Sequence, residues 1–186
     1  MIRLLIQSLR LTAVFTVLTG LVYPMIVTAV AQAAFHHRAN GSLIRRNGKI
    51  LGSELLAQRF QGPRYFWPRP SACGYGMVPS GASNLGPTSG ALRSNVLDNA
   101  RAFREGNKLP SGTPVPADMV FASGSGLDPH ISPEAARLQA PRVAAARGVS
   151  AEQIEAKVVQ FIEPPQFGFL GEPRVNVLRL NLALDE

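Results

Sequence analysis

The chain has 186 residues, of which 46% are hydrophobic and 17% charged, and its formal net charge is +7. The basic residues are scattered, with no run longer than Arg45-Arg46, and this pattern argues against a nucleic-acid-binding groove. A single cysteine, Cys73, excludes an internal disulfide, and the pair His36-His37 is too small a ligand set for a structural metal site.

Residues 11–35 form an apolar run without formal charge and predict one transmembrane helix. At about 1.5 Å per residue the run reaches roughly 37 Å, enough to cross a hydrocarbon core of about 30 Å with tilt. Residues 1–10 would then be a short tail and residues 36–186 a soluble body. The alternatives are a cleaved signal peptide, with Arg3 and Arg10 as its basic region, and a buried globular helix. The run is longer than the about 7–15 apolar residues of a signal peptide, which favours a retained anchor.

The middle of this run carries residues that suit contact with other membrane helices. Thr19 and Gly20 are small and allow close helix approach. Tyr23-Pro24 interrupts the helical hydrogen bonding, and neighbouring helices can compensate for that. These four residues are therefore predicted to pack against partner helices.

Beyond the anchor, turn residues and apolar spacing predict the first elements of the body. Asn47-Gly48 predicts a type I′ hairpin over residues 43–51. Residues 61–90 are dense in Gly, Pro, Ser and Asn and predict a long loop. A helix ending near Gly106 is predicted from apolar residues at helical spacing, namely Leu92, Val96, Ala100 and Phe103.

The C-terminal part carries two helix starts. Ser132-Pro133 predicts a helix that is interrupted near Pro141 and stops at Gly148. Ser150 and Gln153 form a capping box for a second helix, whose apolar face would be Ile154, Val158 and Phe161. Alternating leucines over residues 178–184 predict a strand. The body is thus expected to be a single loop-rich mixed α/β domain.

Catalytic motifs are weak in this sequence. Residues 81–88 have the glycine spacing of a phosphate loop, but Pro87 stands where the lysine is required. Ser125, Asp128 and His130 suggest a hydrolase triad, yet triad members normally converge from separate segments. An Asx-type turn, in which Asp128 accepts from nearby backbone amides, is the favoured interpretation. An exported, membrane-tethered hydrolase or ligand-binding domain using Ser125 and His130 remains the alternative.

Two loops are candidates for an interface. Residues 64–71 place aromatic side chains between arginines and prolines, which suits either the anchoring centre of an interface or a plug of the protein's own core. Arg69 could stack on Trp67. Residues 123–132 form a polar, glycine-rich turn that leads into a helix N-terminus, where backbone amides can hold an anion or simply shape the turn. The candidate interface or structural residues are Arg64, Tyr65, Phe66, Trp67, Arg69, Ser83, Asn84, Ser125, Gly126, Asp128, His130 and Arg142.

Taken in order, several segments resemble the C-subunit family of the Kdp potassium-transporting ATPases, KdpC. They span nearly the whole chain: residues 19–24 (TGLVYP), 39–43 (ANGSL), 52–55 (GSEL), 65–71 (YFWPRPS), 83–87 (SNLGP), 123–132, 139–144 (QAPRVA) and 175–184. Ala82 and Gly76 depart from the usual glycine and asparagine of the family, which puts local loop geometry in question rather than membership.

This resemblance implies a single-span, non-catalytic subunit of a bacterial plasma-membrane complex, in contact with membrane lipid. Its implied partners are a channel-like potassium-binding subunit, a P-type ATPase subunit and a small membrane peptide. The family is also described as a catalytic chaperone that raises the ATP affinity of the ATPase subunit. ATP would then be bound only jointly with that subunit, with Gln139 as the contact.

The side of the membrane decides between two mechanisms. The family is viewed as placing its body outside the cytoplasm, where it could not reach cytosolic ATP. A nucleotide-binding regulator would need the body inside the cell.

Overall fold

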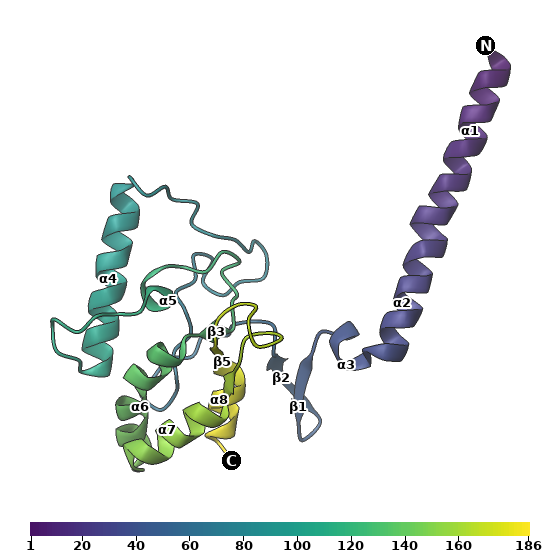
Figure 1. Ribbon diagram of the computed structural model, residues 1–186. Coiled ribbons are helices and arrows are strands. Elements are labelled where there is room, and N and C mark those ends of the chain that lie inside the picture. Colours follow the sequence, from purple (N-terminus) through teal and green to yellow (C-terminus); the bar gives the residue numbers. More distant parts are fainter. The chain divides into compact units, whose positions relative to one another are not determined.

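The computed structural model describes residues 1–186 and divides them into two compact units, Met1–Ser53 and Glu54–Glu186 (Figure 1). The hairpin that follows the apolar helix belongs to the first unit, although the sequence placed it in the body.

The first unit begins with one unbroken helix composed of α1 (Ile2–Val17), a π-helical segment η1 (Leu18–Val22) and α2 (Tyr23–Ala34). It is the one helix long and apolar enough to cross a membrane, and its apolar stretch is not buried within the chain. The helix starts at Ile2 and so includes most of residues 1–10, which the sequence analysis assigned to a short tail. That segment contains leucine, isoleucine, glutamine and arginine with no glycine or proline, a composition that continues a helix.

The π-helical segment lies immediately before Pro24. Proline lacks a backbone N–H, and its ring clashes with the carbonyl four residues earlier, which here is Gly20. The wider π turn over Leu18–Val22 accommodates this without ending the helix. The Thr19 hydroxyl donates to the Phe15 carbonyl at 2.7 Å. This hydrogen bond satisfies the hydroxyl group, for which lipid tails offer no acceptor.

A short helical turn, α3 (His36–Ala39), leads into the antiparallel strands β1 (Leu43–Arg46) and β2 (Lys49–Ser53). Asn47 and Gly48 have φ angles of 51° and 75°, as a type I′ turn requires. The predicted hairpin is confirmed.

The second unit combines helices with a small antiparallel sheet, and the mixed α/β class is confirmed. Residues 54–89 contain no helix or strand, in agreement with the predicted loop. The unit's helices and strands are α4 (Gly90–Asn107), α5 (Ala117–Val120), β3 (His130–Ile131), α6 (Pro133–Arg147), α7 (Ala151–Gln160), β4 (Ile162–Glu163), β5 (Arg174–Asn176) and α8 (Val177–Ala183). The strand order is β3-β5-β4, with β5 central.

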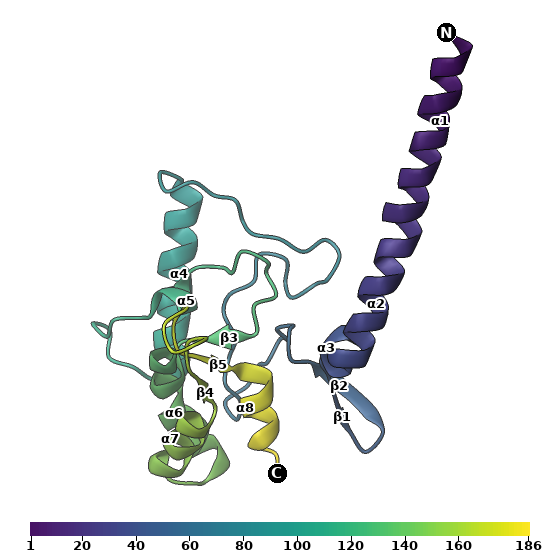
Figure 2. The same cartoon turned by 45° about the vertical axis from the view of Figure 1, so that its right-hand side comes forward.

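The core of this unit forms around α6. Figures 1 and 2 both show α6 and α7 lying side by side, with the lower end of α4 close to α6. Ser132 caps α6 by accepting from the Ala135 N–H at 3.0 Å, and α6 ends at Gly148 with φ 72°. The capping box of Ser150 and Gln153 is also present at α7. The main buried apolar side chains are Phe66, Phe103, Met119, Ile131, Val143, Ile154, Val158, Val175, Val177 and Leu180.

Two sequence predictions in this unit are wrong, the interruption of α6 and the strand at residues 178–184. Helix α6 runs through Pro141 without a break, because the flanking Ala140, Val143 and Ala144 are buried in the core. Their packing outweighs the about 3 kcal/mol that a proline costs within a helix. Helix α4 ends at Asn107 with Lys108 in the left-handed conformation, which confirms the predicted end near Gly106.

The alternating leucines of residues 178–184 form helix α8 and not a strand. The side chain of Asn176 accepts from the Arg179 N–H at 3.1 Å and caps the helix. The fully buried positions include Val177, Leu180 and Asn181, whose spacing is helical. The leucine alternation concealed this pattern because Leu182 and Leu184 are only partly buried.

Candidate functional site

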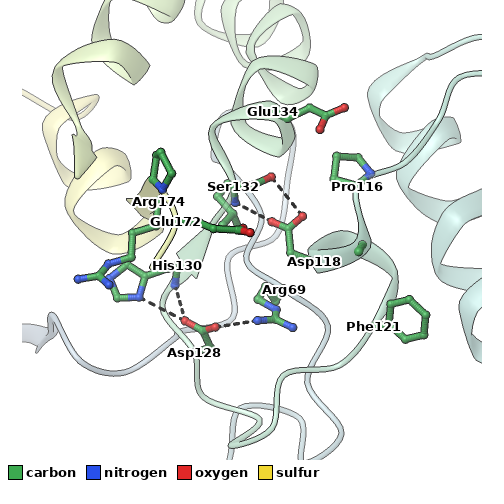
Figure 3. Close-up of a pocket in the computed structure, with 13 residues that line it drawn as sticks. Arg69, Pro116, Asp118, Phe121, Asp128, His130, Ser132, Glu134, Glu172 and Arg174 are labelled. Carbon is green, nitrogen blue, oxygen red and sulfur yellow. Dashed lines mark hydrogen bonds and ion pairs between the residues drawn. The ribbon is translucent and has the colours of Figure 1, made fainter. Parts of the chain in front are cut away.

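A polar pocket of about 760 Å³ opens on the second unit (Figure 3). The loop after Trp67, the turn before β3, the N-terminus of α6 and the start of β5 all contribute to it. Its polar lining consists of Arg69, Asp118, Asp128, His130, Ser132, Glu134, Glu172 and Arg174.

Asp128 organises one side of the pocket. Its Oδ1 accepts from the His130 backbone N–H at 3.0 Å, which is the Asx-type turn expected from the sequence. The His130 Nδ1 lies 3.3 Å from the same oxygen, and Arg69 Nη1 donates to Oδ2 at 2.8 Å. Figure 3 shows the Asp128 carboxylate between the two basic side chains. Arg69 therefore pairs with Asp128 and does not stack on Trp67.

The surroundings of Asp128 favour the ionised form of its carboxylate. Burial opposes ionisation of Asp128, but the hydrogen bonds from His130 and the charge and hydrogen bond of Arg69 outweigh it. Together they lower the pKa of Asp128 from 3.8 to about 2. The network continues through Glu163, whose carboxylate lies 3.8 Å from His130 Nε2 and 3.1 Å from Arg174 Nε. Polar contacts of His130, Glu163 and Arg174 thus join β3, β4 and β5.

Asp118 holds the other side of the pocket. Its Oδ2 accepts from the Ser132 N–H at 2.6 Å, and its Oδ1 accepts from the Ser132 hydroxyl at 3.2 Å. A carboxylate thus already occupies the N-terminus of α6, the position where the sequence suggested an anion could bind. Asp118 was not among the predicted site residues, because nothing in its local sequence links it to Ser132.

The pocket does not assemble a hydrolase triad. The Ser125 hydroxyl accepts from the Leu127 N–H at 3.0 Å, and Ser125 does not line the pocket that contains His130. The hydroxyl of Ser132 is engaged by Asp118 and by the α6 cap. The structure therefore brings Asp128 and His130 together, but it does not place the proposed nucleophile Ser125 in the same pocket.

The aromatic loop is held on the body by two amide side chains. Asn181 on α8 accepts from the Phe66 N–H at 2.8 Å and donates to the Phe66 carbonyl at 2.9 Å. Gln139 on α6 accepts from the Trp67 N–H at 2.7 Å and donates to the Trp67 carbonyl at 3.3 Å. Both amides are 0% exposed. Phe66 is likewise fully buried, so this part of the loop is a plug of the protein's own core.

Arg142 completes this arrangement. Its Nη1 donates to the carbonyls of Gly62, Pro63 and Tyr65 at 3.1, 2.8 and 3.0 Å. Its Nε donates to Asn107 Oδ1, and its Nη2 donates to Gln139 Oε1 at 3.0 Å. Burial lowers the pKa of Arg142 to about 10, which leaves the guanidinium charged at neutral pH.

Two glycines allow close approaches that side chains would block. A Cβ on Gly106 would lie 2.6 Å from the Trp67 ring carbon Cζ3. A Cβ on Gly126, where φ is +71°, would lie 2.9 Å from the Gly81 carbonyl oxygen and would also meet the Cys73 sulfur. Gly126 is thus required by the contact between the 123–132 turn and the preceding long loop.

The other predicted positions lie apart from the pocket. Tyr65 donates to Asp185 Oδ2 at 3.1 Å, and the carbonyl of Arg64 accepts from Arg147, which ties the aromatic loop to the C-terminus. Ser83 and Asn84 are exposed in the long loop, and Asn84 has a positive φ of 52°. Thr19, Gly20, Tyr23 and Pro24 are all exposed on the helix of the first unit.

Comparisons with known proteins agree over the whole chain. The family model described as KdpC, K+-transporting ATPase, c chain, matches residues 5–186. A potassium-transporting ATPase KdpC subunit of Rhodospirillum rubrum is 55% identical, covering 100% of this chain and 97% of the relative. The KdpC subunit of Methylococcus capsulatus is 53% identical over 96% and 95% of the two chains, and that of Mycobacterium tuberculosis is 50% identical over 98% of both.

Proposed function

This chain belongs to the KdpC family of K+-transporting ATPase subunits, and from that premise we propose that it is a non-catalytic, membrane-anchored subunit that stabilises the assembled potassium-uptake complex. The partners would be a channel-like potassium-binding subunit, a P-type ATPase subunit and a small membrane peptide. The body would lie on the extracytoplasmic side of a bacterial plasma membrane.

One observation carries the assembly role. The apolar stretch of the helix Ile2–Ala34 is not buried within the chain, so in a membrane this stretch faces lipid or other proteins. Thr19 and Gly20 lie within η1, where a Cβ added at Gly20 would meet no atom within 4 Å. A small, unobstructed surface of this kind allows another helix to approach closely.

Replacing Thr19 and Gly20 together with leucine should weaken co-purification of the other subunits. Leucines at Thr28 and Ala29, on a later part of the same helix, are the matched control and should have a smaller effect. Unchanged assembly in T19L/G20L would count against a helix interface at this point.

The topology is open to a direct test. Cys73 is partly exposed and is the one cysteine of the chain. Rapid reaction of Cys73 with a membrane-impermeant thiol reagent in intact cells, compared with a denatured sample, is expected for an extracytoplasmic body. Labelling that requires cell lysis would place the body inside.

A second candidate role is to raise the ATP affinity of the P-type subunit through Gln139. The Gln139 side chain is fully buried, and both of its polar ends are hydrogen bonded to Trp67. A nucleotide could reach it only after the aromatic loop had moved away, so this geometry favours the assembly role.

Asn181 supplies the control for this second role, because it holds Phe66 in the same way that Gln139 holds Trp67. Q139A and N181A should release the loop to a similar extent. A rise in the KM for ATP of the complex with Q139A alone would support a nucleotide contact, whereas equal effects would point to loop positioning.

A further inference from the structure

Most of the net positive charge of this chain lies in the unit that contains the apolar helix. The unit Met1–Ser53 contains six cationic side chains and no carboxylate, whereas Glu54–Glu186 contains the other 13 cations and all 12 acidic residues. Four of the six cations follow the helix within a short distance: Arg38, Arg45, Arg46 and Lys49. We refer to residues 36–53, which form α3, β1 and β2, as the basic hairpin.

Hydrogen bonds hold the basic hairpin on the end of the helix. Asn40 Nδ2 donates to Gln32 Oε1 on α2 at 3.1 Å and to the His36 carbonyl at 2.7 Å. The Ser53 hydroxyl donates to the Gly41 carbonyl at 2.6 Å, which joins the far end of β2 to the start of the hairpin. Since the charge-free part of the helix ends at Phe35, a spanning helix would hold the basic hairpin at the depth of the lipid headgroups.

The pairing within the hairpin places like charges together. Arg46 and Lys49 are directly opposite each other across the turn, which concentrates positive charge at this end of the hairpin. Arg38, Arg45 and Lys49 are exposed, and so are the apolar side chains of Phe35 and Ile50. Cations beside exposed apolar groups are typical of elements that lie in a membrane interface.

We propose that the basic hairpin binds the headgroups of anionic phospholipids in the membrane that the helix spans. The proposal rests on the membrane anchoring in the proposed function and adds a ligand class to it. The excess of positive charge favours an anionic ligand. Because the hairpin is attached to the end of α2, the headgroup layer of the membrane is the source of that ligand. Each lysine or arginine close to an anionic membrane surface strengthens binding about fivefold.

The test uses the full chain in its complex, reconstituted in nanodiscs of phosphatidylcholine with a minor fraction of phosphatidylglycerol. After extraction in mild detergent, mass spectrometry measures the retained phosphatidylglycerol relative to its bulk fraction. The wild type should enrich the anionic lipid, and R45Q/K49Q should bind that lipid about 25-fold more weakly and lose the enrichment. High salt should weaken the wild-type enrichment in the same direction.

Two variants keep this result interpretable. R93Q/R101Q removes two exposed charges from α4 and should leave the enrichment unchanged. R45K keeps the charge and should retain the enrichment. Equal enrichment in the wild type and R45Q/K49Q, or equal loss in R93Q/R101Q, would overturn the proposal. So would loss of partner subunits at unchanged lipid enrichment, because the hairpin would then be a protein contact.

Alkaline carbonate extraction separates this proposal from the one on which it rests. R45Q/K49Q should stay in the membrane fraction, since its helix is unchanged. A wild-type chain released by carbonate would contradict the anchoring itself, and with it the lipid site.

Discussion

The guanidinium carbon of Arg142 lies 3.9 Å from the centre of the Trp67 ring. Gly106 is in close contact with the same ring, so that α4 and α6 both contact this side chain. The Trp67 Nε1–H donates to the Gly62 carbonyl at 2.9 Å, and Arg142 donates to that carbonyl as well. The aromatic loop is thus part of the scaffold that supports the pocket, and Trp67, the single tryptophan, can report on it by fluorescence.

Replacing Arg142 with lysine should destabilise the body by about 2–4 kcal/mol, although the charge is kept. A lysine cannot reproduce the fork of contacts to Asn107, Gln139 and the loop carbonyls. Denaturant unfolding of the full chain in detergent, followed by Trp67 fluorescence, measures the loss. R137K, at an exposed position of the same helix, should change stability by less than about 0.5 kcal/mol. A stable R142K would mean that the contacts to the loop carbonyls contribute little.

Gly106→Ala should destabilise the protein, which reverses the usual effect of that substitution. Inside a helix, alanine is normally favoured over glycine by about 1 kcal/mol. Here the new methyl group would overlap the Trp67 ring, and overpacking of this kind costs about 1–3 kcal/mol. Gly90→Ala at the start of the same helix meets open space and should be neutral or stabilising. Thermal unfolding compares the two; a G106A protein at least as stable as the wild type would contradict the close packing on Trp67.

Asp128 should make stability depend on acid pH. Its pKa is lowered from 3.8 to about 2 in the folded protein, so its contribution is complete above pH 3.8 and disappears as the pH falls through 2. The side chain is 30% exposed, and solvent screening reduces the contribution to about 1–2 kcal/mol. D128N should therefore be less stable than the wild type at pH 6, and the difference should shrink at pH 2. D98N, at an exposed position, is the control, and a pH-independent difference for D128N would argue against the ion pair.

Local signals in the sequence predicted many elements of the fold. The apolar run, the Asn47-Gly48 turn and the Ser132 and Ser150 caps each depend on neighbouring residues alone, and each is found in the structure. The elements that the sequence did not predict correctly depend on tertiary contacts. Packing in the core carries α6 through Pro141, and Asn181 binds Phe66 from within α8. The alternating leucines around Asn181 gave the opposite local signal.

The candidate site was only partly predictable for the same reason. The Asx turn of Asp128 is local and was expected. Three other contacts of the site join segments that are apart in the sequence. Asp128 pairs with Arg69, Asp118 accepts hydrogen bonds from Ser132, and Arg142 stacks on Trp67. A buried arginine or glutamine does not reveal its partner from spacing alone. Gly106 lies at the predicted end of a helix, but its spacing in the sequence does not show that it packs against Trp67.

The central claim is that the N-terminal helix docks with other subunits as well as anchoring the body. The most direct measurement replaces residues 2–34 with an unrelated single-span helix and quantifies the partner subunits that co-purify from membranes. The account predicts that the chimera stays in the membrane fraction and loses most of its partners, because the Thr19-Gly20 surface is gone. Full recovery of the complex with the foreign helix would contradict it.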